Sequence, residues 1–359
     1  MTDTLTQLRQ AFAGQTVLVT GHTGFKGSWL TLWLLKLGAK VVGYSLPDAP
    51  TTPSFFEEAN LAAHLQQDGR GDLADLAGLV TLLEQQKPTI LFHLAAQPIV
   101  GRGYQYPKET FDTNSGGVVN VLEAIRLTGC VKTAVFITTD KVYENQEWSW
   151  GYRENDRLGG ADPYSASKAM AELAVNAYRH SFLQGKTAVA TARAGNVIGG
   201  GDFAPYRLVP DVMQSLLNGR SIPVRRPDST RPWQHVLEAL YGYLLLAAHL
   251  QTNPTLATAW NFGPQEKQGI TARAIVEKLI ALWGSGQWEH TEPEFQGKET
   301  NLLQLSWDKA ANQLGWHPCY TWQEALAEIT DWFKAFEAGA NMYQIGLDHI
   351  EAYEARLKT

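Results

Sequence analysis

Short apolar runs alternate with amphipathic stretches over the first half of the chain. The first run, Gln15–Thr20, is rich in β-branched residues and leads into a glycine-rich loop, after which an apolar segment continues until Gly38. This order predicts a strand, a loop and a helix over about Ser28–Leu37. Similar apolar runs predict further strands at Lys40–Ser45, Thr89–Leu94, Thr133–Thr138 and Thr187–Arg193.

The alternation of these strands with helical stretches predicts an α/β fold, a Rossmann-type doubly wound parallel sheet covered by helices. After about Asn196 the alternation of strands and helices ends in a loop rich in Gly, Pro and Arg. Predicted helices follow, notably over Ala272–Leu282 and Trp322–Ala338. We therefore expect a smaller, mainly helical C-terminal lobe. The expected division assigns residues 1–195 and 236–262 to the Rossmann domain, and residues 196–235 and 263–359 to the lobe.

Bulk composition narrows the class of protein. With 359 residues, the chain is long enough for two lobes around a sizeable core. Its 30 basic and 36 acidic residues give a net charge of −6, which argues against nucleic acid or a membrane surface as partner. No run approaches the ~20 apolar residues of a membrane span, and no secretion signal is recognisable. The two cysteines, Cys130 and Cys319, suit the reducing cytoplasm and offer no zinc-binding spacing, so we expect a cytoplasmic protein without a metal site.

A glycine-rich loop joins the first predicted strand to the first predicted helix. Its glycines stand three residues apart, whereas the common dinucleotide-binding fingerprint is G-x-G-x-x-G. Glycine lets the backbone approach a pyrophosphate closely, and the following helix directs free N–H groups and its positive dipole end at it. An ordinary strand-to-helix turn is the alternative, but the position in the first βα unit favours a dinucleotide site. The predicted contacts are Gly21, Thr23, Gly24, Phe25, Lys26 and Gly27.

The second predicted strand bears on the choice between NAD and NADP. It ends Gly43-Tyr44-Ser45, without the acidic residue that usually binds the adenosine ribose. No basic residue stands nearby to receive the 2′-phosphate of NADP, so NAD is the favoured cofactor. Asp72 could contact adenine or, alternatively, cap a helix. The further predicted cofactor contacts are Asp72, Leu73, Leu94, Ala95, Ala96 and Gln97.

Two Tyr-x-x-x-Lys spacings occur, at Tyr104/Lys108 and at Tyr164/Lys168. Pro107 interrupts the first, whereas the second contains good helix formers and follows a proline that suits a helix start. Residues four apart share one helix face, so Lys168 can stabilise a Tyr164 phenolate. Tyr164 is therefore a candidate base for a sugar hydroxyl, and both side chains are also expected to contact the cofactor.

The end of the predicted strand Thr133–Thr138 supplies a third participant. Thr139 follows that strand and carries a hydroxyl that can hydrogen-bond to the reacting oxygen. Together with Tyr164 and Lys168 it resembles the Ser/Thr, Tyr, Lys triad of the extended short-chain dehydrogenase/reductase family. Longer stretches resemble the motifs of CDP-glucose 4,6-dehydratases, namely residues 20–29, 93–98, 138–143, 193–202 and 231–236.

This resemblance implies a lyase reaction on CDP-glucose, in deoxysugar and surface polysaccharide (lipopolysaccharide) biosynthesis. NAD would oxidise glucose C4, water would leave across C5 and C6, and the hydride would return to C6. Asp140 is the implied acid at the C6 hydroxyl, and Lys141 stands where dTDP-glucose dehydratases carry a carboxylate base. Our hypothesis is that a desolvated, neutral Asp140–Lys141 pair performs the elimination. The alternative is that Lys141 only orients the substrate or Asp140.

The resemblance also implies how the sugar nucleotide binds. Asn196 and Arg231 match family motifs near the diphosphate, and Arg207 comes from an arginine-rich stretch whose guanidinium groups suit a diphosphate. The apolar helices near Phe111–Thr128 and Tyr164–Phe182 would pair in a homodimer or homotetramer, or else cover the sheet. Two other functions stay open: a nucleotide-sugar 4-epimerase, which needs no elimination acid, and a catalytically silent dinucleotide-binding protein.

Overall fold

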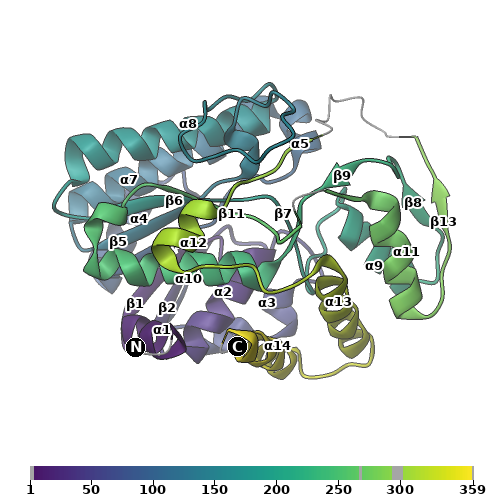
Figure 1. Cartoon of the computed structure of the whole chain (residues 1–359). Helices are drawn as coiled ribbons and strands as arrows, with labels where there is room; N and C mark the ends of the chain where they lie inside the picture. The colour runs from purple at the N-terminus through teal and green to yellow at the C-terminus, as the bar shows by residue number, and fades with distance from the viewer. Residues whose placement is uncertain (1–3, 267–268, 293–301, 358–359) are drawn as a thin grey trace.

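The central element of the protein is a parallel β-sheet. The computed structural model describes residues 4–266, 269–292 and 302–357. Within these residues, seven strands form one sheet in the order β11-β6-β5-β4-β1-β2-β3, and every neighbouring pair is parallel (Figure 1). The strands are β1 Thr16–Thr20, β2 Lys40–Ser45, β3 Gln67–Arg70, β4 Ile90–His93, β5 Thr133–Ile137, β6 Ala188–Ala194 and β11 Ala259–Phe262. The strand order reverses between β1 and β4, the point at which such sheets bind ligands.

Helices cover both faces of the sheet (Figure 1). One face carries α1 Thr4–Phe12, α2 Phe25–Lys36, α10 Val236–Thr252 and α14 Met342–Arg356; the other carries α4 Leu76–Gln86, α7 Gly117–Thr128 and α8 Pro163–Tyr178. Because both faces are buried, the inner strands are mainly apolar: Val17, Leu18 and Val19 of β1 have no exposed surface. Short helical segments lie at α3 Phe55–Glu58, η1 Leu61–His64, α5 Val100–Gln105, α6 Pro107–Phe111, η2 Asp112–Gly116, η3 Asp140–Val142, η4 Arg179–Leu183 and η5 Pro254–Leu256.

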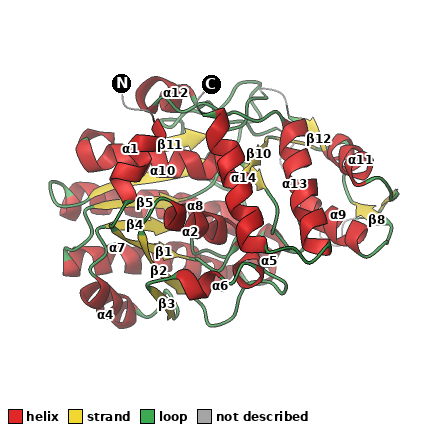
Figure 2. Cartoon of the chain, turned by 90° about the horizontal axis from the view of Figure 1, so that it is seen from below, coloured by secondary structure: helices red, strands yellow, loops and turns green. Residues whose placement is uncertain are grey.

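The C-terminal helix α14 packs against α2, as the view from below shows (Figure 2). The Trp33 indole Nε1 and the Lys36 ammonium of α2 donate to the two carboxylate oxygens of Glu354, at 2.9 and 2.8 Å. The central α10 is apolar on nearly all sides because β5, α1, α2 and α12 surround it. Even so, none of the helices that the structure describes has the length and apolar character needed to cross a membrane.

The remaining elements form a smaller region beside the sheet, at the right of Figures 1 and 2. Its strands pair two by two: β7 with β10 and β8 with β13 in parallel, and β9 with β12 in antiparallel orientation. The elements are β7 Asn196–Ile198, α9 Leu208–Leu217, β8 Ile222–Val224, β9 Thr230–Arg231, β10 Trp233–His235, β12 Ile270–Thr271, α11 Ala272–Trp283, β13 Trp288–His290 and α13 Trp322–Glu337. The helix α12 Asp308–Leu314 packs instead on α10 and β11, beside the sheet.

The structure confirms the predicted α/β fold and all five predicted strands, with small differences at their ends. Two strands of this sheet were not predicted: β3 reads Gln-Asp-Gly-Arg and lacks an apolar run, and β11 spans only four residues. The short paired strands of the smaller region were not predicted either. The helix after the glycine loop begins at Phe25 rather than Ser28, because Gly24 is its N-cap. The division into a Rossmann domain and a lobe stays a prediction, and its outer limits, residues 1 and 359, lie outside the described residues.

Candidate active site

The glycine loop lies between β1 and α2 and packs tightly on its surroundings. A Cβ added at Gly27 would stand 2.0 Å from the Gly21 carbonyl oxygen, and one added at Gly21 would stand 2.6 Å from the Ala95 backbone nitrogen. The fold itself therefore requires both glycines. A Cβ at Gly24 would meet nothing closer than 3.4 Å, so the chain leaves room there. That room, at the N-terminus of α2 with its free N–H groups, fits a pyrophosphate.

Behind the loop, polar side chains connect β2 with β3. His22 hydrogen-bonds to Ser45 Oγ and Asp68 Oδ1, both at 2.8 Å, and Arg70 Nη2 donates to Asp68 Oδ2 at 2.7 Å. Burial lowers the pKa of His22 and so works against a charged imidazole, although Asp68 opposes this shift. The two strands place Arg70 directly beside Ser45, so the statement that no basic residue stands nearby was wrong. Local sequence could not show this, because the pairing of β2 with β3 was not predicted.

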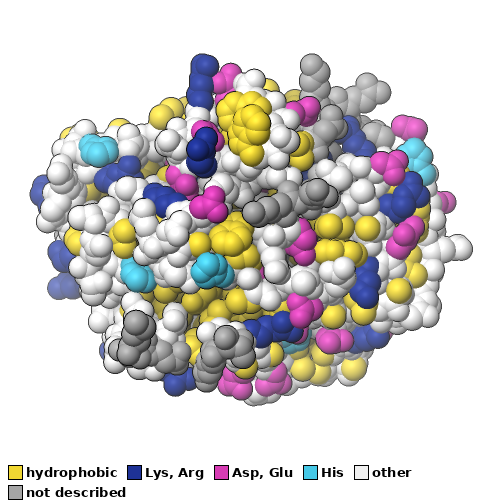
Figure 3. All heavy atoms as spheres, in the orientation of Figure 1, with side chains coloured by type: hydrophobic (Ala, Val, Ile, Leu, Met, Phe, Trp, Pro, Cys, Tyr) yellow, Lys and Arg dark blue, Asp and Glu magenta, His cyan; other side chains and the backbone are white. Residues whose placement is uncertain are grey.

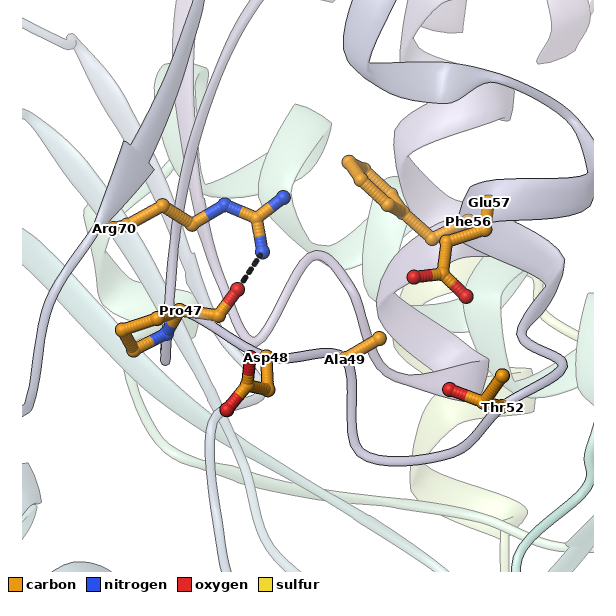
Figure 4. Close-up of a pocket in the computed structure, with 7 residues that line it drawn as sticks. All are labelled: Pro47, Asp48, Ala49, Thr52, Phe56, Glu57 and Arg70. Atoms are coloured by element: carbon orange, nitrogen blue, oxygen red, sulfur yellow. Dashed lines mark hydrogen bonds between the residues drawn. The ribbon is translucent and has the colours of Figure 1, made fainter.

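A hollow of about 310 Å³ opens after β2, next to Arg70 (Figure 4). The Arg70 guanidinium lies 5.4 Å from the ring centre of Phe56 and donates to the Pro47 carbonyl at 3.2 Å. Asp48 and Glu57 also line the hollow, so its walls carry two carboxylates for one guanidinium. Carboxylates repel a phosphate and accept hydrogen bonds from ribose hydroxyls. The hollow therefore fits the adenosine ribose of NAD better than the 2′-phosphate of NADP.

The remaining predicted cofactor contacts lie in two loops at the same edge of the sheet. Asp72 is exposed, and its Oδ1 accepts from the Ala74 N–H at 2.8 Å, so its carboxylate also stabilises the turn before α4. Leu73 is buried beneath Gly117. After β4, the backbone of Leu94 and Ala95 lies against Gly21 of the glycine loop. The side chain of Gln97 donates to Thr110 Oγ1 at 2.9 Å and accepts from the Ile99 N–H at 2.6 Å. Leu94, Ala95 and Ala96 are partly exposed.

Tyr164 and Lys168 lie one turn apart in α8 and are both buried. The Lys168 ammonium donates to the Ile137 carbonyl at 3.3 Å, which places it beneath the end of β5. Burial raises the pKa of Tyr164 to about 12, against the effect of a hydrogen bond with Thr139, and lowers the pKa of Lys168 to about 8. The other spacing does not form such a pair, since Tyr104 and Lys108 lie in separate short helices, α5 and α6.

The three residues after β5 bring an acid next to the tyrosine. Thr139 Oγ1 donates to Asp140 Oδ1 at 2.9 Å. Asp140 is 3% exposed, and burial raises the pKa of its carboxyl group although Lys141 and Arg231 oppose that shift. Burial thus shifts the carboxyl group toward its neutral form. Thr139 thus hydrogen-bonds to Asp140 on one side and to Tyr164 on the other.

Lys26 was predicted only as a cofactor contact, but its side chain also lies near the catalytic residues. Burial lowers its pKa to about 7, and the neighbouring charges that act on it include Lys168 and Arg207, which lower it, and Asp140, which raises it. No hydrogen bond or ion pair holds its ammonium group within the described parts of the chain. The predicted cofactor residue therefore also faces the catalytic groups.

Sequence reasoning missed Glu172, a buried residue of α8 whose carboxylate hydrogen-bonds to residues at the neighbouring strands. Its carboxylate accepts from Thr138 Oγ1 at 2.5 Å, from Thr191 Oγ1 at 2.7 Å and from two nitrogens of Arg193 at 2.9 Å. These bonds join α8 to both β5 and β6. Glu172 follows Lys168 by one helical turn, so the spacing Tyr164-Lys168-Glu172 along one helix face was the available signal.

The predicted substrate residues come from three places in the smaller region. Asn196 begins β7 and is paired with Trp233 of β10. Arg207 precedes α9, forms an ion pair with Asp202 at 3.1 Å and lowers the pKa of Tyr164. Arg231 lies in β9 and lowers the pKa of Asp140. The charges of the two guanidinium groups therefore act on the catalytic side chains.

Similarity to known proteins covers nearly the whole chain. The CDP-glucose 4,6-dehydratase of Salmonella typhimurium is 47% identical over 347 residues, covering 95% of this chain and 96% of that protein. The dTDP-glucose 4,6-dehydratase of Xanthomonas campestris is 27% identical, covering 89% of this chain and 93% of that protein.

Solved structures with lower identity share the fold. A dTDP-glucose 4,6-dehydratase from Streptomyces venezuelae, solved with NAD bound, has a TM-score of 0.77 at 23% identity and covers 92% of this chain and all of that one. An epimerase from Methanothermobacter thermautotrophicus has a TM-score of 0.80 at 22% identity, covering 94% of this chain and 97% of that one. The family model described as GDP-mannose 4,6 dehydratase matches residues 18–329. The chain therefore belongs to the GDP-mannose 4,6-dehydratase family.

Proposed function

We infer that the chain is an NAD-dependent lyase that converts CDP-glucose to CDP-4-dehydro-6-deoxyglucose and water, a step in deoxysugar biosynthesis. The observation that carries this inference is the buried Asp140 beside Tyr164, because a dehydratase needs an acid that a 4-epimerase does not. The 47% identity to the CDP-glucose 4,6-dehydratase of Salmonella typhimurium supports the substrate.

The cofactor is NAD. When bound, NAD would supply the acceptor for the hydride of glucose C4 and the donor of the hydride to C6. The room left at Gly24 and the free N–H groups at the start of α2 hold the pyrophosphate, and the hollow beside Arg70 receives the adenosine ribose. The other contacts we propose are Gly21, Thr23, Phe25, Lys26, Gly27, Asp72, Leu73, Leu94, Ala95, Ala96, Gln97, Tyr164 and Lys168.

Oxidation at C4 requires a base for the C4 hydroxyl. Tyr164 takes this proton, the Lys168 ammonium stabilises the phenolate, and Thr139 hydrogen-bonds to the same sugar oxygen. The closeness of Thr139 to Tyr164 supports this arrangement. Asn196, Arg207 and Arg231 hold the diphosphate, and the charge of Arg207 at Tyr164 favours the phenolate further.

Elimination follows because the C4 ketone acidifies the C5 proton. Lys141, in its neutral form, takes that proton while Asp140 protonates the departing C6 hydroxyl, which leaves as water. After the hydride reaches C6, Lys141 returns its proton to C5. The proton that Tyr164 took from the C4 hydroxyl restores Asp140, and Thr139 lies between these two residues to carry it. All atoms of the overall reaction then balance.

Incubation with NAD and with CDP-, dTDP-, GDP- and UDP-hexoses, followed by mass spectrometry, tests the function. We expect CDP-glucose to lose one water. An unchanged mass with inverted C4 would instead identify an epimerase, and no conversion of any sugar would favour a protein that only binds the dinucleotide.

We also propose that two copies of the chain associate through α7 and α8, as a homodimer or within a homotetramer. Monomeric proteins rarely expose many large apolar side chains on adjacent helices. Here Val119, Leu127, Met170, Leu173 and Phe182 are 37–59% exposed on α7, α8 and the adjoining η4. Light scattering should give a dimer or tetramer, and Leu173→Lys should give monomers.

The proposed location is the cytoplasm, and the proposed partner is a small nucleotide sugar rather than a nucleic acid or a membrane. Cys130 and Cys319 are both free, as is usual in a reducing compartment. On the face shown in Figure 3, basic and acidic side chains are interspersed, which does not favour a polyanion.

A further inference from the structure

A cluster of three side chains lies in the smaller region of the molecule, around the N-terminal half of α9. It consists of Tyr206, Asp211 and Arg225, called here the Arg225 cluster. Arg225 Nη2 forms an ion pair with Asp211 Oδ2, and the Arg225 guanidinium lies 5.9 Å from the ring centre of Tyr206. Asp211 also accepts a hydrogen bond from the Tyr206 backbone. The carboxylate thus holds both other members in place.

The Arg225 cluster is open to a ligand. The side chains of Arg225 and Asp211 are 31% and 22% exposed, and Tyr206 is 61% exposed. Tyr206 has a φ of +64°, a left-handed conformation that costs free energy in a residue other than glycine and recurs at ligand clamps. Arg225 also lines a hollow of about 620 Å³ together with Trp288 and His290. Hollows of this size accept a nucleoside.

Arg207 links the cluster to the catalytic site. It directly follows Tyr206 and precedes Asp211 by one turn of α9. Its charge acts on both Tyr164 and Lys26, so its guanidinium lies near the catalytic centre, while its backbone is continuous with Tyr206 of the cluster. If the proposed function is correct, a diphosphate bound at Arg207 would direct the glucose toward Tyr164 and the base toward Arg225.

The Arg225–Asp211 pair presents the hydrogen-bonding pattern that cytosine requires. Cytosine carries an amine donor at N4 beside two acceptors, N3 and O2. The guanidinium of Arg225 offers two parallel N–H donors for these acceptors, and Asp211 has free lone pairs for the amine. Uracil and thymine carry a carbonyl in place of the amine and an N–H at N3. Their carbonyl would face the carboxylate of Asp211, and their N–H would face the guanidinium of Arg225.

We propose that the Arg225 cluster is the nucleobase subsite and that Arg225 and Asp211 select cytosine over uracil and thymine. The exposed ring of Tyr206 offers a surface on which the base stacks. This proposal rests on the proposed function and adds the residues that choose the nucleotide. Selectivity then comes from mismatched polar groups that stay unpaired with the wrong base.

The test compares kcat/KM for CDP-glucose and UDP-glucose in the wild-type enzyme, in Asp211→Asn and in Arg225→Lys. Arg225→Lys keeps the positive charge and removes the two parallel donors. Each variant should reduce the preference for CDP-glucose by about tenfold or more, mainly through KM for CDP-glucose. Arg220→Met, an exposed change just before β8, serves as the matched control and should keep the preference.

Dissociation constants of CDP and UDP, measured by calorimetry without turnover, provide a second readout, and the melting temperature of each variant establishes that it is folded. Variants that keep the wild-type CDP preference would overturn the proposal, as would variants that lose activity on both sugars equally. A wild-type enzyme that binds CDP no more tightly than UDP would also overturn it. If the wild-type enzyme dehydrates none of the sugars, the proposed function itself fails, which is a different result.

Discussion

Burial acts in opposite directions on the two side chains of the catalytic pair. It raises the pKa of Tyr164 to about 12 and lowers that of Lys168 to about 8, because each group loses the hydration of its charged form. The ligand-free site therefore favours a neutral phenol. Deprotonation of Tyr164 becomes easier as the pH rises, whereas Lys168 starts to lose its stabilising charge at about pH 8.

This balance predicts the pH dependence of C4 oxidation. The rate should increase as the pH approaches about 8 and gain little above that value. Single-turnover experiments that follow the absorbance of reduced nicotinamide across this range measure the step directly. A rate that decreases over the same interval would contradict the assignment of Tyr164 as the base.

Lys141→Met separates the two half-reactions. Because the variant lacks only the proposed C5 base, C4 oxidation should persist while exchange of the C5 hydrogen with deuterated water should decrease by about 10²–10⁴-fold, the usual contribution of a general base. Mass spectrometry of the sugar after incubation in deuterated water measures the exchange. If exchange continues at the wild-type rate, Lys141 is an orienting residue.

At the level of elements, the glycine loop needs glycine for two different reasons. Gly27 is required by backbone packing, whereas Gly24 leaves space for the cofactor. Gly27→Ala brings a Cβ against backbone atoms of Gly21, so it should lower the melting temperature as well as NAD affinity. Gly24→Ala meets only a 3.4 Å contact and should leave the melting temperature nearly unchanged while weakening NAD binding. Thermal unfolding and calorimetric NAD titration of both variants test this pair. Wild-type NAD affinity in Gly24→Ala would show that the pyrophosphate lies elsewhere.

Local sequence patterns predicted the individual strands and helices. They did not predict which elements lie next to one another in space. The five apolar strands were recognisable because a sheet buried on both faces requires continuous apolar runs. β3 escaped detection because it lies at the sheet edge and carries Asp68 and Arg70, which serve His22 and the loop after β2. The approach of Lys26 to Asp140 likewise depends on tertiary packing. Neither the pairing of β3 with β2 nor the approach of Lys26 to Asp140 produces a periodic pattern in the sequence.

For the molecule as a whole, a buried carboxyl group couples stability to pH. Glu238 of α10 is 1% exposed, and its Oε1 accepts from the backbone N–H groups of Cys319 and Tyr320 at 2.7 and 2.9 Å. Burial raises the pKa of Glu238 to about 7 in spite of these bonds. The folded chain therefore binds more protons than the unfolded chain between the ordinary pKa of 4.5 and about 7, and stability falls as the pH rises through that interval.

Glu238→Gln should remove this contribution. The amide oxygen can replace Oε1 and keep both backbone hydrogen bonds, while the variant carries no charge at any pH. Relative to the wild type, the variant should gain up to about 3 kcal/mol in the free energy of unfolding by pH 8. Urea unfolding of both proteins at several pH values measures the difference, and a constant difference across the range would contradict the prediction.

The strand order has a consequence for how the protein is made. The edge of the sheet beside β6 is filled by β11, and the outer side of α2, with Trp33, is covered by α14. Until residues 259–262 and 342–356 have been synthesised, the nascent chain therefore displays an open strand edge and an uncovered tryptophan-rich helix. Such surfaces promote aggregation. A fragment ending at residue 195 should accordingly be insoluble, as centrifugation of the expressed fragment would reveal, and the growing chain should depend on chaperones until its last helices dock.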